Sequence, residues 1–108
     1  MSPAYLEFDL SEDADGLSTW DALASPPATH TGALLAEVRA LLRLLQQLGP
    51  AGPVDEGHDW DMDLQLHDEH GQVLSIDGDG LPVGRVSLAL SLTGRSALAA
   101  AIARWTRS

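Results

Sequence analysis

Residues 59–67 read Asp-Trp-Asp-Met-Asp-Leu-Gln-Leu-His, which is the clearest strand pattern in the chain. Apolar side chains alternate with polar ones along it, and the first three polar positions are Asp59, Asp61 and Asp63. Because successive side chains of a β-strand point to opposite faces of its sheet, this period of two predicts a strand with one apolar and one acidic face. We expect the apolar face to join the core and the acidic face to remain in solvent.

The segments that follow show the same alternation. A tight turn over 68–71 is expected to lead into a strand over 73–77, with Leu74 and Ile76 pointing inward. A last strand is predicted over 86–92, where every second residue is Val or Leu. Short turns between strands favour antiparallel pairing, so we expect these segments to lie side by side in one sheet.

The N-terminal part of the chain predicts a hairpin. Leu6, Phe8 and Leu10 alternate with polar residues, as in a half-buried strand, and residues 11–16 are turn-forming. Residues 17–24 are expected to return as the second strand. A short helix at the end of that segment is the competing interpretation, and we favour the hairpin.

Two segments have helical periodicity. Between residues 31 and 48 apolar side chains recur at every third or fourth position, and Gly49 with Pro50 predicts the end of this helix. Its apolar stripe consists of Leu34, Val38, Leu41, Leu45 and Leu48, widened by Leu35, Leu42 and Leu44. This arc is wider than one contact with a sheet requires, so we expect a second helix or a partner chain to cover its edge.

The second helix is predicted over about residues 94–106. We expect Thr93 to cap its N-terminus. Its core stripe is Leu98, Ile102 and Trp105, with Ala97 and Ala101 allowing close approach to neighbouring elements.

The predicted elements follow the order β-β-α-β-β-β-α. We therefore expect residues 1–108 to form a single α+β domain, a two-layer sandwich. Its mainly antiparallel sheet would have four to five strands, with two helices on one face.

Charge is strongly biased along the chain. Its 108 residues include 16 acidic residues and six arginines but no lysine, and the formal net charge is −10. Six acids lie in residues 1–30 and nine in residues 55–79, and neither block contains a basic residue. Nucleic-acid backbones and anionic membrane surfaces are bound mainly by clustered Lys and Arg, so we exclude both and expect a basic partner.

Other features of the composition limit the cellular compartments and the kinds of chemistry that are compatible with this chain. Cysteine is absent, which excludes disulfides, thiolate catalysis and cysteine-ligated metals. No signal-peptide pattern is visible at the N-terminus, and the longest apolar run, 97–103, is shorter than a membrane span. The lack of Lys and Asn beside abundant Ala, Leu, Gly and Arg indicates a GC-rich genome. We expect a cytoplasmic, bacterial protein that needs no cofactor.

The aspartate row is the most conspicuous candidate site. Neighbouring side chains on one face of a strand are about 6.8 Å apart, so Asp59, Asp61 and Asp63 cannot all converge on one ion. A catalytic carboxylic acid needs a desolvated cleft, which a solvated strand face does not provide. We therefore interpret the row as a solvated or protein-binding face.

Two other patterns carry weaker hypotheses. His67 and His70 bracket the 68–71 turn, where they are interpreted as turn residues rather than metal ligands. Gly94, Arg95 and Ser96 lie where a strand is expected to enter a helix. The free N–H groups of a helix N-terminus can hold phosphate or carboxylate, so these residues form a candidate anion site.

No catalytic constellation is apparent, and we do not expect an enzyme. The favoured hypothesis is a small acidic protein-interaction module of the adaptor, chaperone-like or inhibitor/immunity type, binding a basic protein through the aspartate face. The alternative is a module that binds a small anion at the N-terminus of the last helix. Either a monomer or a homodimer formed through the edge of the first helix is compatible with the sequence.

Overall fold

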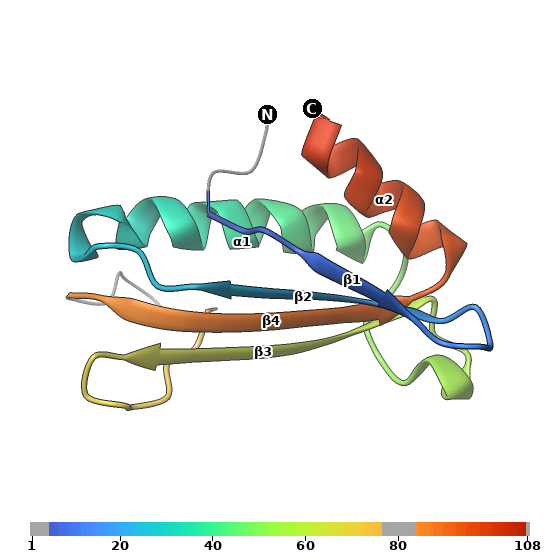
Figure 1. Ribbon diagram of the computed structural model, residues 1–108, viewed down its shortest axis with the longest axis horizontal. Helices are drawn as coiled ribbons and strands as arrows, with labels where there is room; N and C mark the ends of the chain where they lie inside the picture. Colours follow the sequence, from blue (N-terminus) through green and yellow to red (C-terminus); the bar gives the residue numbers. More distant parts are fainter. Residues whose placement is uncertain (1–4, 77–83, 108) are drawn as a thin grey trace.

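The computed structural model describes residues 5–76 and 84–107, which form one antiparallel sheet and two α-helices. The strands are β1 (Asp9–Glu12), β2 (Ser18–Ala24), β3 (Trp60–Asp68) and β4 (Val86–Gly94); the helices are α1 (Thr31–Gln46) and α2 (Ser96–Arg107), with short 3-10 turns η1 (Ala28–His30) and η2 (Val54–Glu56). The strand order is β1-β2-β4-β3, and both helices cover the same face of the sheet (Figure 1). This confirms the predicted α+β sandwich.

The core lies between the helices and one face of the sheet. All four alternate apolar residues of β4 are buried: Val86, Leu88, Leu90 and Leu92. On β3, Trp60 and Leu66 are buried, whereas Met62 and Leu64 are half-buried against the core. The period of two in 59–67 and 86–92 therefore predicted these strands and their inward faces correctly. The hairpin interpretation of 17–24 is confirmed as well, because β2 is a strand with Trp20 buried.

Helix α1 buries the predicted stripe. Leu34, Val38, Leu41 and Leu45 are fully buried, and Leu48, just beyond the helix, packs against the core half-buried. The wide apolar arc is covered by α2, as expected. The chain's own N-terminal segment also lies against α1. That segment is fixed by Glu37, whose Oε2 accepts hydrogen bonds from the amides of Tyr5 (3.0 Å) and Leu6 (2.7 Å).

The first strand begins later than predicted. Strand β1 starts at Asp9 rather than near residue 5, and Leu10, expected to point into the core, is 54% exposed. Leu6 is buried and Phe8 half-buried, but they pack before the strand begins, with the Phe8 ring 6.3 Å from the Trp105 ring. The alternation over 5–10 thus reflects contacts with the helices and not a place in the sheet.

The strand predicted over 73–77 is reduced to a single bridge between His67 and Val73. Leu74 and Ile76 do point inward, as half-buried and buried side chains, and residue 77 lies outside the described residues. The carbonyl of Ile76 accepts hydrogen bonds from Nε (3.1 Å) and Nη2 (3.0 Å) of Arg39. Because Arg39 belongs to α1, these bonds draw the segment away from β3.

The junction between β4 and α2 also differs from the prediction. Thr93 does not cap the helix, since β4 continues to Gly94 and α2 begins at Ser96. Residue 94 pairs with both neighbouring strands, which extends β4 past the expected end. Within α2, Ala101 is fully buried as predicted, whereas Ala97 is exposed.

In the described ranges, neither helix has the length and hydropathy that crossing a membrane would require.

Candidate functional site

The face of the sheet opposite the helices carries a row of carboxylates. In the register of the sheet Asp9 pairs with Asp21, Asp21 pairs with Ser91, and Ser91 pairs with Asp63, so the row crosses all four strands. Asp61 lies two residues before Asp63 on β3 and therefore on the same face. We call Asp9, Asp21, Asp61 and Asp63 the acidic face.

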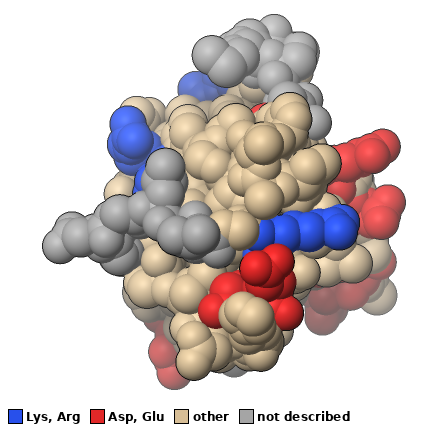
Figure 2. Space-filling view, turned by 90° about the vertical axis from the view of Figure 1, so that its left-hand side faces the viewer, with Lys and Arg blue, Asp and Glu red and all other residues tan. Residues whose placement is uncertain are grey.

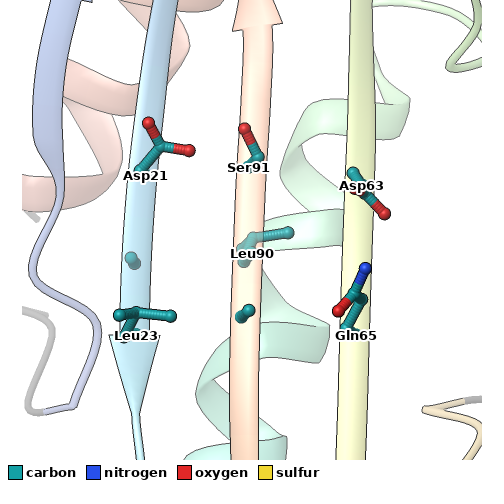
Figure 3. A pocket seen from close by; sticks show the side chains of 8 residues that line it. Asp21, Leu23, Asp63, Gln65, Leu90 and Ser91 are labelled. Carbon is teal, nitrogen blue, oxygen red and sulfur yellow. The ribbon is translucent and has the colours of Figure 1, made fainter.

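A shallow hollow runs between these carboxylates. Figure 3 shows Asp21 and Leu23 on β2 at one side of it, and Asp63 and Gln65 on β3 at the other, while both helices pass behind the sheet. Its floor is Ser91 with its small neighbours on β4, and its volume is about 150 Å³. Two neighbouring strand spacings of about 4.8 Å separate the walls, which leaves room for one extended side chain.

The hollow has an apolar component as well as an acidic one. Leu23 is 80% exposed, although it is a large hydrophobic residue. It stands beside Asp21 at the rim of a second, larger hollow that Glu7 and Asp9 also line. An exposed leucine between carboxylates offers a partner both a hydrophobic and an electrostatic contact.

Asp9 and Asp21 stand directly opposite one another in adjacent strands. Like charges in this position destabilise a sheet. We therefore expect Asp21→Lys, which replaces repulsion by attraction, to raise the free energy of unfolding by about 0.5–1 kcal/mol at low salt. Urea unfolding monitored by tryptophan fluorescence measures the change.

The matched control is Glu56→Lys, which alters net charge equally at an exposed position in η2. If Glu56→Lys stabilises the protein as much as Asp21→Lys does, the gain comes from net charge and the local repulsion is absent. If Asp21→Lys destabilises it, the cross-strand contact is not repulsive.

The three aspartates singled out in the sequence have different positions. Asp63 is exposed on the acidic face. Asp61 is half-buried, and its Oδ1 accepts a hydrogen bond of 2.8 Å from the amide of Met62. Asp59 is exposed but precedes β3, so it lies outside the paired rows. The structure thus brings Asp61 and Asp63 together with Asp9 and Asp21, which the sequence analysis did not single out.

The candidate anion site has acidic surroundings. Gly94 is a buried strand residue, while Arg95 and Ser96 are exposed at the start of α2. Arg95 lines a hollow of about 430 Å³ together with three aspartates: Asp13, Asp15 and Asp61. An anion entering this hollow would meet three carboxylates, so the geometry disfavours the anion-binding alternative.

Only one of the two histidines is a turn residue. His67 lies half-buried in β3, and His70 is exposed in the turn that follows. The carboxylate of Asp68 organises this turn by accepting hydrogen bonds from the amides of His70 (2.8 Å) and Gln72 (2.9 Å). Within residues 5–76 and 84–107, no three His, Asp or Glu side chains are grouped so that they could hold a metal ion.

The basic side chains are partly used within the fold. Arg85 donates from Nε (3.1 Å) and Nη2 (2.7 Å) to the carbonyl of Ser25, much as Arg39 does to Ile76. Figure 2 shows the end of the molecule where β3 finishes and β4 begins, with acidic side chains gathered toward the right and the bottom. Neither Arg39 nor Arg85 lines the hollow of the acidic face.

No protein family, no curated protein and no solved structure matches this chain.

Proposed function

We propose that this protein is a non-enzymatic interaction module that binds a basic partner protein through its acidic face. The observation that carries the proposal is the row of Asp9, Asp21 and Asp63 across a sheet face that neither described helix covers. An adaptor, a chaperone-like factor and an inhibitor of a basic protein would all use such a surface. We further propose that it acts in the bacterial cytoplasm, as a monomer or a homodimer.

The shape of the site favours binding over catalysis. The hollow between Asp21 and Asp63 is shallow and open, so water solvates both carboxylates. The desolvated cleft that usually keeps a catalytic carboxylic acid protonated at neutral pH is not provided by this open sheet face. Solvated carboxylates attract cationic groups over a distance and speed association with a basic surface.

The register that sets Asp9 opposite Asp21 supports the same proposal. Opposed like charges cost stability in the free protein, and a cationic group from a partner would relieve that cost. Leu23, exposed beside them, would supply hydrophobic contact that charge alone does not give. Both features would make the complex with a basic partner more stable than the free protein.

The test is affinity capture from the source cell with three versions of the immobilised protein. We expect the wild type to retain a basic protein at low salt and to release it at high salt. The double variant Asp21→Asn/Asp63→Asn should lose most of this capture, because it removes the two charges that flank the hollow. Mass spectrometry identifies and quantifies the retained protein.

The control is Glu12→Gln/Glu56→Gln, which removes the same number of charges elsewhere. Glu12 pairs with Ser18, on the helix side of the sheet, and Glu56 lies in η2. This variant should capture the partner as the wild type does. Equal capture by all three proteins, or the absence of any salt-sensitive basic partner, would contradict the proposal.

A further inference from the structure

The outer edge of β3 has backbone groups that point away from the sheet. Strand β3 is the last strand in the order β1-β2-β4-β3, so one of its edges has no neighbouring strand among residues 5–76 and 84–107 (Figure 1). The chain's own backbone uses this edge at its two ends. The carbonyl of Trp60 accepts a hydrogen bond from Gly52 (3.1 Å), and that of Leu66 accepts one from Leu74 (2.8 Å).

Between these two contacts lies a short open slot. Backbone groups alternate in direction along a strand, so those of Met62 and Leu64 point outward with those of Trp60 and Leu66. The outward amide of Met62 is occupied by the Asp61 carboxylate. The Met62 carbonyl and both backbone groups of Leu64 bond to no other described residue. The slot therefore offers one donor and two acceptors to an added strand.

The side chains beside the slot define what that strand must carry. On the open side of the sheet stand Asp61 and Asp63, which belong to the acidic face. On the helix side stand Met62 and Leu64, which pack on the core but are only half-buried. A strand laid here would place alternate residues beside the two carboxylates and the residues between them over the two apolar side chains.

We propose that the slot binds an extended segment of the basic partner, in which Lys or Arg alternates with apolar residues, as an added β-strand. This inference rests on the proposed function, because it names the part of the partner that the protein recognises. Backbone hydrogen bonds to Leu64 hold the segment, and its alternating side chains match those of β3. The Lys or Arg side chains of the segment lie beside the carboxylates of the acidic face.

A second copy of this protein fits the slot less well. Pairing of β3 with its own copy across a two-fold axis would set Asp61 and Asp63 against the same carboxylates of the other chain. Like charges directly opposite one another are unfavourable in a sheet, whereas a basic strand replaces each repulsion by an attraction. Charge complementarity therefore selects the basic segment.

A capped peptide of alternating lysine and valine is the probe. Added to the labelled full-length protein at low salt, it should slow hydrogen exchange of the Leu64 amide about tenfold or more, as measured by NMR. The amides of Asp63 and Gln65 point toward β4, so their exchange rates should not change. A peptide of the same composition with lysines and valines in two separate blocks should leave Leu64 unprotected.

Two N-methylated peptides complete the test. One carries the methyl groups on its valine amides and the other on its lysine amides, so only one of them blocks the edge that faces β3. Loss of Leu64 protection with one and its retention with the other supports strand addition. Equal behaviour of the two, protection only through a dimer detected by light scattering, or no protection at all overturns it.

The outcome separates this inference from the proposed function. If Asp21→Asn/Asp63→Asn abolishes capture of the partner but no peptide protects Leu64, the acidic face binds the partner without adding a strand. If the alternating peptide protects Leu64 but capture is unaffected by the double variant, strand addition stands and the proposed function fails.

Discussion

Replacement of Trp60 by alanine should lower the free energy of unfolding by about 3–5 kcal/mol. Trp60 is 1% exposed and is the largest of the fully buried side chains. Its indole Nε1 also donates a hydrogen bond of 3.0 Å to the carbonyl of Gly49, just after α1. Removing the ring leaves a cavity between the helices and the sheet and an unpaired carbonyl. The free energy of unfolding of a domain of this size is only about 5–15 kcal/mol, so the variant should be close to unfolding at room temperature.

The variant Trp60→Phe separates the two contributions. It keeps most of the apolar volume but removes the indole donor, so its loss should be smaller, about 1–2 kcal/mol. Urea denaturation followed by far-ultraviolet circular dichroism measures both variants. A loss below about 1 kcal/mol for Trp60→Ala would mean that this side chain does not hold β3 against the helices.

Gly94→Ala should lower the free energy of unfolding by about 1–3 kcal/mol, which is a large loss for the addition of one methyl group. A Cβ at residue 94 would lie 2.8 Å from Cδ2 and 2.9 Å from Cβ of Leu98, and 3.0 Å from the carbonyl oxygen of Asp59. Gly94 is paired on both sides, with Ser18 and with Trp60, so its backbone cannot shift without disturbing two ladders. The cost is therefore steric.

The matched control for Gly94→Ala is Ser91→Ala, on the same strand but on the open side. We expect it to change stability by less than about 0.5 kcal/mol, because its side chain lies on the face of the sheet opposite the helices. Thermal unfolding of both variants gives the comparison. If Gly94→Ala were as stable as Ser91→Ala, α2 would not approach the sheet as closely as Leu98 indicates.

Most of the strands and helices could be predicted from the periodicity of the sequence. The alternation of 59–67 and 86–92 and the stripe of 31–48 reflect contacts that each segment makes with a whole layer, so a local pattern records them. The errors arose where one side chain redirects the backbone. Glu37 accepts hydrogen bonds from the amides of Tyr5 and Leu6, which lie 32 and 31 residues away, and no local pattern encodes such a contact.

Contacts between segments far apart in the sequence also explain the other two differences. Arg39 takes the carbonyl of Ile76 from 37 residues away, which ends strand pairing after Val73 although the sequence there still alternates. Thr93 looked like a helix cap because caps are recognised from the sequence around a helix start. The decisive factor was pairing of Gly94 with two strands, and that depends on the register of the sheet.

The candidate site could be predicted only in part. Asp61 and Asp63 follow from the period of two, because both lie on one strand. Asp9 and Asp21 join them only through the registers of β1 with β2 and of β2 with β4. Two of the three aspartates around Arg95, Asp13 and Asp15, come from the turn after β1, which lies beside the start of α2 in the fold. Sequence periodicity places residues on faces, but only pairing assembles them into a site.

Three exposed apolar residues provide the most direct test of the acidic face as the binding surface. Leu23 lies on that face, Leu10 lies on the helix side of β1, and Val73 lies in the loop after β3; they are 80%, 54% and 78% exposed. Their methyl groups can be followed by NMR in the presence of a soluble paramagnetic agent, with and without the captured partner. We predict that the partner shields the Leu23 methyls and leaves those of Leu10 accessible. Shielding of Leu10 or Val73 while Leu23 remains accessible would show that the partner binds to a surface other than the acidic face.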